Sequence, residues 1–301
     1  MELGMVGLGR MGANMAERLL RGGHKVTGFD PNADARKALE GKGAASADSL
    51  QALVQALPTP RVVWLMVPAG AITDDTVNTL LSLLSPGDTV IDGGNSNYND
   101  TLRRAALYRE HKLGYVDCGT SGGVWGLAEG YSMMVGGDEA VVKHLQPIFE
   151  TLAPAKDAGW GRVGPVGSGH FTKMVHNGIE YGMMQAYAEG FSILEHKQEF
   201  GLDLAQIGQI WRQGSVVRSW LLDLTTDALT KNPKMDGIAP YVADSGEGRW
   251  TVDEAIQLNV PAPVITLSLI ARLRSRDTES FTDKLLSSMR NEFGGHAIKK
   301  E

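Results

Sequence analysis

Five side chains of the kinds that move protons or hold polar ligands lie close together near the middle of the sequence. Lys173, Asn177 and Glu180 are spaced at i, i+4 and i+7, and His176 and Tyr181 flank them. On a helix of about 3.6 residues per turn, these side chains project from one face over two turns. An ordinary solvated surface is the alternative, although an exposed Lys–Glu pair usually stands four residues apart rather than seven. This row of five side chains alone is consistent with both a functional site and a solvated surface, so the rest of the sequence is needed to distinguish them.

The composition indicates an ordinary globular protein with room for two domains. The chain has 301 residues, of which 43% are hydrophobic and 21% are charged, so a full core can form without disulfides. Its net charge of −6 argues against nucleic acid or an anionic membrane as the main partner. The single cysteine, Cys118, excludes an internal disulfide and fits a reducing cytoplasm. No apolar run approaches transmembrane length and the first strand leaves no room for a signal peptide, so we expect a cytoplasmic protein.

The N-terminal stretch has the pattern of a dinucleotide-binding fold. A strand pattern from Leu3 to Val6 precedes a glycine-rich turn, a helix continues through Leu20, and a second strand, Lys25 to Phe29, leads to Asp30. The turn consists of Gly7, Leu8, Gly9, Arg10, Met11 and Gly12. Its glycines allow the backbone to approach a pyrophosphate, and the helix N-terminus offers unpaired N–H groups to it. An incidental glycine-rich turn is the alternative, but the strand before it and the helix after it favour the dinucleotide.

The acidic residue after the second strand indicates which dinucleotide binds. Asp30 follows Gly12 by 18 residues, near the spacing expected of the acid that binds the adenosine ribose hydroxyls. Its carboxylate would repel a 2′-phosphate, so we expect NAD rather than NADP as the cofactor. Arg36 lies close enough in the sequence to keep NADP as an alternative.

Strand and helix patterns alternate through the first half of the chain. Further strands are predicted at Val62 to Val67, Thr89 to Asp92, Tyr115 to Asp117 and Ser132 to Val135, and helices at Ala47 to Leu57, Asp75 to Leu84, Asp100 to His111 and Glu139 to Leu152. The segment from Cys118 to Gly123 is predicted to be a loop. Polar, glycine-rich segments follow three strands, at Val67 to Gly70, Gly93 to Ser96 and Ser121 to Gly123. In a doubly wound sheet such segments lie on one rim, so a ligand pocket is expected there.

Strand signals stop after Gly167, and the second half of the chain is predicted to be helical. Its helices are expected at Phe171 to Lys197, Leu204 to Trp211, Val216 to Leu229, Thr251 to Leu258, Ala262 to Arg274 and Phe281 to Asn291. The turn from Gly164 to Gly167 is the natural boundary. The predicted fold is a doubly wound α/β domain of Rossmann type over residues 1–166, followed by an all-helical substrate and dimerisation domain over residues 167–301.

Three longer motifs occupy the predicted rim and the central helix. They are Ile91-Asp92-Gly93-Gly94-Asn95-Ser96, Ser121-Gly122-Gly123, and Gly169-His170-Phe171-Thr172-Lys173-Met174-Val175-His176-Asn177-Gly178-Ile179-Glu180-Tyr181. Together they resemble the 6-phosphogluconate dehydrogenases, in particular their short form, and the resemblance covers nearly the whole chain. The third motif distinguishes this family from the 3-hydroxyisobutyrate-type dehydrogenases, which share the glycine fingerprint and a lysine but lack the run from His176 to Tyr181.

The resemblance implies oxidative decarboxylation of 6-phosphogluconate to ribulose 5-phosphate and carbon dioxide, a step of the pentose phosphate pathway. Lys173 resembles the family's general base, which must be neutral when substrate is bound; burial and neighbouring cations can bring the pKa of a lysine toward ~7–8. The resulting 3-keto acid can lose carbon dioxide without a metal, because its carboxylate is β to the carbonyl. Glu180 resembles the acid that protonates C1 of the enediol. No metal is expected.

The resemblance also implies two sets of binding residues. The substrate-binding positions are Asn95, Ser121, Gly122, Gly123, His176, Asn177, Tyr181, Arg272, Arg290 and His296, with Tyr181 and Arg272 among the phosphate contacts. The cofactor-binding positions are Gly7, Leu8, Gly9, Arg10, Met11, Gly12, Asp30, Val67, Pro68, Ala69 and Asn95. Arg290 and His296 belong to a C-terminal segment that, in the family, reaches into the active site of the neighbouring subunit. We therefore expect a homodimer or homotetramer that acts on a small sugar phosphate.

The sequence departs from the family pattern at three positions. The family's phosphate-binding lysine falls on Ser245, which carries no charge, and Val124 and Asn97 replace acidic residues that are usual in the long form. The missing lysine bears on the strength of phosphate binding and on the identity of the substrate. Arg249 could compensate for it, although an ordinary surface arginine is an equal alternative.

Three other functions stay open on the sequence. Another β-hydroxyacid dehydrogenase, of the 3-hydroxyisobutyrate type, would act on a smaller or non-phosphorylated acid, keep Lys173 and have no use for Glu180. A metal held by His176 and Glu180 at i, i+4 would have only two ligands, too few for a site. A non-catalytic dinucleotide sensor would bind NAD and release no carbon dioxide.

Overall fold

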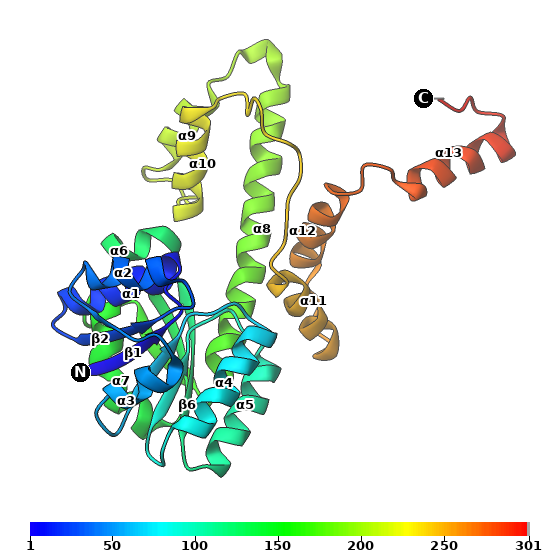
Figure 1. The fold of residues 1–301 in the computed structure, drawn as a ribbon. Helices are drawn as coiled ribbons and strands as arrows, with labels where there is room; N and C mark the ends of the chain where they lie inside the picture. The colour runs from blue at the N-terminus through cyan, green and yellow to red at the C-terminus, as the bar shows by residue number, and fades with distance from the viewer. Residues whose placement is uncertain (300–301) are drawn as a thin grey trace. The chain divides into compact units, whose positions relative to one another are not determined.

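The computed structural model describes residues 1–299 and divides the chain into two compact units between His176 and Asn177. The first unit is an α/β sheet domain, and the second consists of helices (Figure 1). Helix α8 (Ser168–His196) begins in the first unit and continues into the second. The predicted order, a Rossmann-type domain followed by a helical one, is confirmed. No helix among residues 1–299 is long and apolar enough to span a membrane.

The strands of residues 1–176 form one mixed sheet. They are β1 (Glu2–Val6), β2 (Lys25–Phe29), β3 (Ala45–Ser46), β4 (Val62–Leu65), β5 (Thr89–Asp92), β6 (Gly114–Ser121), β7 (Ser132–Gly136) and β8 (Trp160–Gly164). Their order in the sheet is β3-β2-β1-β4-β5-β6-β7-β8, and neighbours pair in parallel except β6 and β7. The chain changes direction across the sheet between β1 and β4, which is where such sheets bind ligands.

Helices cover both faces of the sheet because its strands direct alternate apolar residues to each side. The helices are α1 (Arg10–Arg21), α2 (Ala33–Glu40), α3 (Leu50–Ala56), α4 (Ala71–Leu83), α5 (Tyr98–Glu110), α6 (Gly126–Glu129) and α7 (Glu139–Leu152), with a 3₁₀ turn η1 (Gly123–Trp125). Helices α1 and α7 pack on one face with Trp64 and Ile91, whereas α3, α4 and α5 pack on the other with Val63 and Val90. Helices α4 and α5 lie side by side (Figure 1).

One row of paired residues marks the carboxyl edge of the parallel strands. Phe29 of β2 pairs with Val6 of β1, and Val6 pairs with Leu65 of β4. Leu65 in turn pairs with Asp92 of β5, and Asp92 pairs with Asp117 of β6. Because these residues are in register, the segments that follow Val6, Leu65 and Asp92 leave the sheet at the same edge.

Strand β6 extends further than the sequence predicts. The predicted loop from Cys118 to Gly123 is wrong over its first four residues, because Cys118 to Ser121 belong to β6. These residues pair with the antiparallel strand β7, Cys118 with Val135 and Thr120 with Met133. Such pairing depends on a segment further along the chain, so the local pattern does not reveal it. The elements α2, β3, α6 and β8 are also absent from the predicted set, and several other boundaries differ by a few residues.

The second unit consists of helices that follow α8. They are the 3₁₀ turn η2 (Gln198–Phe200), α9 (Leu204–Trp211), α10 (Trp220–Lys231), α11 (Glu247–Gln257), α12 (Pro263–Arg274) and α13 (Phe281–Gly294). Phe191 of α8 and Leu222 and Leu229 of α10 form a small core, against which α9 packs. Gly178 lets α8 approach α11, because a Cβ there would lie 2.6 Å from the Thr251 side chain.

Candidate active site

The glycine-rich turn after β1 leaves room for a dinucleotide. Gly7 has a φ of +90°, which favours glycine, and a Cβ on Gly12 would overlap the carbonyl oxygen of Gly7. A Cβ on Gly9, by contrast, would meet nothing within 4 Å. Gly9 is the N-cap of α1, and no side chain of the described chain caps this helix end. Open space in front of uncapped N–H groups fits a pyrophosphate, so the residues present fit NAD.

Asp30 is held at the end of β2 by two backbone groups. The Leu8 N–H donates to Oδ2 at 2.8 Å, and the Asn32 N–H donates to Oδ1 at 2.8 Å. The first donor belongs to the glycine-rich turn, so the structure brings this turn and Asp30 together. The Arg36 guanidinium donates from Nη1 to the carbonyl oxygens of Asp30 and Pro31, at 2.7 and 3.3 Å. Arg36 is therefore close to Asp30 in space as well as in sequence.

The loops after β4 and β5 pack against each other at the rim. A Cβ on Gly94 would lie 2.9 Å from the carbonyl oxygen of Val67, so this close approach needs glycine. The exposed residues of the two loops include Pro68, Ala69 and Asn95. The structure thus brings together the predicted cofactor-binding residues of both loops.

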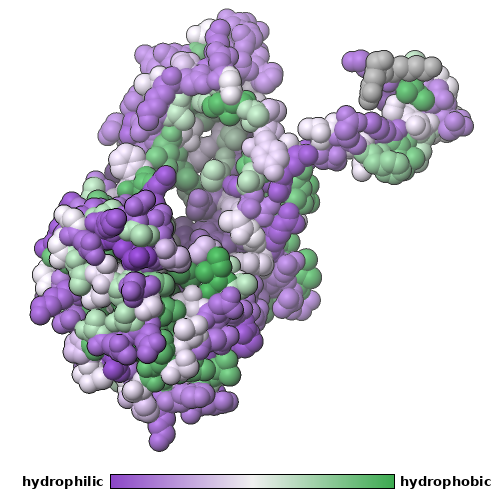
Figure 2. Space-filling model, in the orientation of Figure 1, coloured by the Kyte–Doolittle hydropathy of each residue, from purple (hydrophilic) through white to green (hydrophobic). Residues whose placement is uncertain are grey.

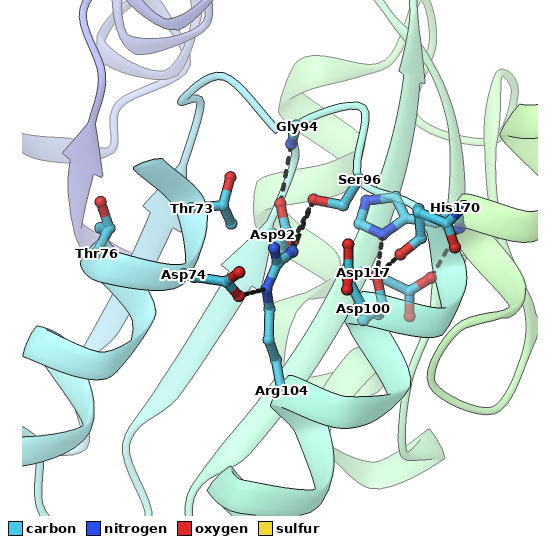
Figure 3. Close-up of polar contacts among 12 residues, drawn as sticks. Thr73, Asp74, Thr76, Asp92, Gly94, Ser96, Asp100, Arg104, Asp117 and His170 are labelled. Atoms are coloured by element: carbon cyan, nitrogen blue, oxygen red, sulfur yellow. Dashed lines mark hydrogen bonds and ion pairs between the residues drawn. The ribbon is translucent and has the colours of Figure 1, made fainter. Parts of the chain in front are cut away.

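A buried polar cluster supports the Asn95 loop (Figure 3). Asp92 is fully buried and accepts hydrogen bonds from the Gly94 N–H at 3.2 Å, the Ser96 hydroxyl at 2.8 Å and the Tyr115 hydroxyl at 3.2 Å. Burial and the neighbouring Asp92 raise the pKa of Tyr115 well above its ordinary value, so its hydroxyl stays a donor. Arg104 of α5 joins the cluster, with Nη1 3.4 Å from Asp92 Oδ2.

Glycines allow the start of α8 to lie directly against the sheet. A Cβ on Gly169 would lie 2.7 Å from the carbonyl oxygen of Asp117 and 2.8 Å from the Gly136 nitrogen. A Cβ on Gly119 of β6 would overlap the Cβ of Lys173. The backbone of β6 therefore forms the surface on which Lys173 rests.

Asp117 fixes this helix end to the sheet. It is fully buried and accepts hydrogen bonds from the Gly167 N–H at 2.7 Å and the His170 N–H at 2.8 Å. N–H groups at the start of a helix have no acceptor within the helix, so Asp117 satisfies them. The His170 ring is bound in turn by the hydroxyl of Thr101 on α5, 2.7 Å from Nδ1. The sequence does not identify Asp117 or Thr101, because these contacts join residues 50 to 69 positions apart.

Lys173 is a buried residue of α8. The residue is 7% exposed, and its Nζ lies 3.4 Å from Nδ1 of His176. A lysine is rarely buried unless it is paired or functional, so a solvated surface is the wrong interpretation for this position. Helix α8 is continuous through Asn177 and Glu180, both partly buried, so the predicted spacing along one helix face holds.

Ser121, Gly122 and Gly123 turn the chain at the end of β6. Gly122 and Gly123 have φ values of +140° and +50°, and the 3₁₀ turn η1 starts at Gly123. Ser121 is the last residue of β6, so it shares this strand with Gly119, which contacts Lys173, and Gly122 and Gly123 follow directly. Burial raises the pKa of the Cys118 thiol on this strand to about 12.

Two predicted phosphate contacts meet in the second unit. The Arg272 guanidinium lies 3.6 Å from the centroid of the Tyr181 ring, a cation–π contact. The Tyr181 hydroxyl accepts a hydrogen bond from the Ser245 N–H at 3.2 Å. Gly248 makes room for the buried Tyr181 ring, which a Cβ would overlap. Position 245, where the resemblance places a lysine, therefore lies beside Tyr181.

Arg249 already has a partner in this structure. Asp244 accepts hydrogen bonds from Nε and Nη2 of Arg249, at 3.1 and 3.2 Å, and from Nη2 of Arg276 at 2.6 Å. The two guanidinium groups lower the pKa of Asp244 to about 2. For Arg249 to replace the missing lysine, this pairing would have to open.

Arg290 and His296 belong to the C-terminal end of the second unit. Arg290 is exposed on α13, and His296 follows Gly295, whose left-handed conformation ends that helix. The Asn291 side chain donates to the carbonyl oxygen of His296 at 2.8 Å. Their expected place in a site depends on a second subunit.

Among residues 1–299, no group of three His, Cys, Asp or Glu side chains lies close enough to hold a metal ion. Within that part of the chain, the considered pair His176 and Glu180 thus has no third ligand of these types.

The doubly wound sheet, the open glycine turn and the buried lysine define a dinucleotide-dependent dehydrogenase. The NAD binding domain of 6-phosphogluconate dehydrogenase matches residues 2–161, and the C-terminal domain of the same enzyme matches residues 169–298. The chain belongs to the 6-phosphogluconate dehydrogenase family.

Two relatives match the chain over its full length. A putative 6-phosphogluconate dehydrogenase of Bacillus subtilis is 43% identical over 301 residues, 100% of both chains. An NAD(+)-dependent, decarboxylating 6-phosphogluconate dehydrogenase of Haloferax volcanii is 42% identical over 100% of this chain and 99% of its own. Another NAD(+)-dependent, decarboxylating enzyme from B. subtilis is longer, since a match of 38% identity covers 91% of this chain and 61% of that relative.

Solved structures show the same fold. Plasmodium falciparum 6-phosphogluconate dehydrogenase superposes with a TM-score of 0.84 at 28% identity, covering 100% of this chain and 66% of that one. A 3-hydroxyisobutyrate dehydrogenase of Mycobacterium tuberculosis superposes with a TM-score of 0.74 at 24% identity, covering 92% of this chain and 94% of the other. At that identity, the second likeness concerns the fold alone.

Proposed function

We propose that the chain catalyses the oxidative decarboxylation of 6-phosphogluconate to ribulose 5-phosphate and carbon dioxide, with NAD as the hydride acceptor. The observation that carries this proposal is helix α8, which buries Lys173 against β6 and continues through His176, Asn177 and Glu180. The full-length similarity to a decarboxylating, NAD(+)-dependent relative supports it. A 3-hydroxyisobutyrate-type enzyme would share the fold but would not need the run from His176 to Tyr181.

We assign Lys173 and Glu180 to the two proton transfers of the reaction. Lys173 takes the proton of the C3 hydroxyl while the hydride leaves C3, and burial suits it because a neutral amine is the form that can accept a proton. NAD, when bound, supplies the hydride acceptor. The C1–C2 bond then breaks, carbon dioxide leaves, and the electron pair passes to the C3 oxygen, to which protonated Lys173 donates a hydrogen bond. Glu180 delivers a proton to the carbon that lost the carboxylate, which becomes C1 of ribulose 5-phosphate.

The cofactor contacts that we propose are the glycine-rich turn and Asp30. The uncapped N-terminus of α1 would receive the pyrophosphate, and the carboxylate of Asp30 would bind the ribose hydroxyls. The Leu8 N–H orients this carboxylate. The exposed Asn95 lies on the same rim, so we assign it to both cofactor and substrate.

We assign the substrate phosphate to Tyr181, Arg272 and the N–H groups around Ser245. The cation–π contact holds the Arg272 guanidinium over Tyr181, and its charge is the main attraction for a phosphate in this group. Since Ser245 has no charge, we expect weaker phosphate binding than a lysine would give.

One assay tests the function. The purified protein is incubated with 6-phosphogluconate and either NAD or NADP, and both reduced cofactor and released carbon dioxide are measured. We expect equal amounts of the two products, with NAD preferred. Gluconate and 3-hydroxyisobutyrate serve as comparison substrates, and faster turnover of either one would overturn the proposal. Binding of NAD without any carbon dioxide would instead support a dinucleotide sensor.

The assembly that we propose is at least a homodimer in which Arg290 and His296 complete the site of the other subunit. Apolar side chains gather on one side of α13 (Figure 2). The exposed ones are Phe281, Leu285, Leu286 and Met289. A helix with such an exposed apolar side gains stability from a second chain, because apolar surface is removed from water on contact.

A further inference from the structure

The loop that carries Asn95 is anchored on both sides of that residue. Asn95 itself is exposed, whereas its neighbours Gly94 and Ser96 are buried. The Gly94 N–H and the Ser96 hydroxyl donate to the two carboxylate oxygens of Asp92, at 3.2 and 2.8 Å. The direction of the Asn95 side chain thus depends on how firmly Asp92 holds its neighbours.

Arg104 of α5 connects this anchor to helix α4 (Figure 3). Its side chain is 1% exposed, and Nη1 lies 3.0 Å from the Ser96 hydroxyl and 3.4 Å from Asp92. Its Nε donates to Asp74 of α4 at 2.9 Å. A planar guanidinium can hold three partners in fixed directions, which an ammonium cannot do. Arg104 therefore joins the end of β5, the Asn95 loop and α4.

Helix α5, which carries Arg104, also holds the start of α8. Thr101, one turn before Arg104, bonds to the ring of His170 at 2.7 Å. Tyr98 lies three residues before Thr101, at the start of α5. Its ring packs edge-on against the ring of Phe171, with 5.3 Å between the centroids. Phe171 is two residues before Lys173. One helix thus makes contact with both the Asn95 loop and the segment that presents Lys173.

We propose that Arg104 is a positioning residue for hydride transfer, which acts by fixing the Asn95 loop to helix α5 and so relative to Lys173. This inference rests on the proposed function, because it needs Asn95 and Lys173 in their assigned roles. Arg104 is buried behind the loop, so its effect passes through Asp92 and Ser96. A displacement of about 1 Å in a reacting group can cost about 100-fold in rate, so a loosened loop lowers kcat.

The test compares Arg104→Gln with Arg103→Gln and adds Ser96→Ala. Arg103 is the matched control, since it is the adjacent arginine, binds the same Asp74 at 2.8 Å and is half exposed. Ser96→Ala removes only the hydroxyl that Asp92 and Arg104 share, so it tests the anchor even if Arg104→Gln does not fold. The measurements are kcat, KM for both substrates, the melting temperature, and the isotope effect with 6-phosphogluconate deuterated at C3.

We expect Arg104→Gln and Ser96→Ala to lower kcat about 10- to 100-fold and to raise the isotope effect, whereas Arg103→Gln stays close to wild type. The effect must also depend on Asn95. In an Asn95→Ala background, adding Ser96→Ala should change kcat by less than about twofold, because the residue being positioned is already gone.

Four results overturn the inference in distinguishable ways. An unchanged kcat in Ser96→Ala, or a loss that stays the same in the Asn95→Ala background, removes the positioning role while the proposed function stands. A loss in Arg103→Gln equal to that in Arg104→Gln would indicate a general effect of Asp74. A wild-type protein that does not oxidise 6-phosphogluconate overturns the proposed function and the role of Arg104 with it.

Discussion

Lys173 owes its position to the absence of a side chain at Gly119. Its Cβ occupies the place that a Cβ on Gly119 would need, so the side chain of Lys173 starts in contact with the backbone of β6. Lys173 as a whole is largely removed from water, and its Nζ lies 3.4 Å from Nδ1 of His176. These contacts suit a group that alternates between an uncharged and a charged form during a reaction.

Substitution of Lys173 tests its assignment as the general base. We expect Lys173→Met to lower kcat by at least about 10³-fold, because general-base catalysis contributes roughly 10²–10⁴-fold and the side chain also assists decarboxylation. NAD binding, measured by calorimetry, should be unchanged. Lys197→Met is the control, since Lys197 lies just beyond the same helix and is half exposed. Near-normal turnover in Lys173→Met would refute the assignment.

Asp30 is the second single residue with a testable role, because we assign the preference for NAD to its carboxylate. We expect Asp30→Ser to raise the ratio of kcat/KM for NADP to that for NAD by at least about tenfold, or about 1.4 kcal/mol, because the repulsion of a 2′-phosphate disappears. Arg36 at the Asp30 carbonyl could then face the phosphate. Asp34→Ser removes the same charge from an exposed position on α2 and should leave the ratio unchanged. An equal change in both variants would show a general charge effect.

At the scale of elements, the contact between α8 and the sheet tolerates no added atoms. A Cβ on Gly119 would also lie 2.8 Å from the carbonyl oxygen of Gly169, so Gly119→Ala must displace the helix. We expect it to lower the free energy of unfolding by about 1–3 kcal/mol and to reduce kcat as well. Denaturant titration and kinetics measure the two effects.

Gly161→Ala provides the comparison for this variant. Gly161 is also a strand glycine, on β8, and a Cβ there would meet nothing within 4 Å. It should change neither stability nor rate appreciably. If Gly119→Ala behaves in the same way, close packing of α8 on β6 does not position Lys173.

The elements also show what could be predicted from the sequence. The strand–helix alternation, the glycine turn and the row of five side chains on α8 follow from local periodicity, and the structure has them. The extension of β6 through Ser121 could not be predicted, because it depends on β7. A local pattern also does not predict the roles of Asp92, Asp117 and Arg104. Each is a single charged residue in an ordinary strand or helix, and its role comes from its burial among partners that are distant in the sequence. The contact between Tyr181 and Arg272 likewise joins separate helices, and the family resemblance indicated both residues as phosphate contacts but not this contact.

At the scale of the whole molecule, the proposed exchange of C-terminal segments predicts complementation between two inactive variants. Lys173→Met and the double variant Arg290→Ala, His296→Ala are co-expressed with different affinity tags. If the segment acts on the other subunit, each mixed dimer contains one intact site. Random assembly makes half of the dimers mixed, and one of two sites in each is intact, so about a quarter of wild-type activity is expected.

The outcome separates the two arrangements of the tail. If Arg290 and His296 serve their own subunit, every site in a mixed dimer carries one lesion and activity stays near zero. Light scattering of the purified mixture gives the subunit number, and a monomer would refute the assembly outright.

The burial of Cys118 has a practical consequence. The thiol has no exposure to water, and its high pKa keeps it protonated and unreactive while β6 and β7 stay paired. A thiol reagent can therefore modify it only when this part of the sheet opens. The next residue, Gly119, contacts Lys173. The rate at which the reagent labels Cys118 in the wild-type protein therefore measures how often the part of β6 beneath Lys173 opens transiently.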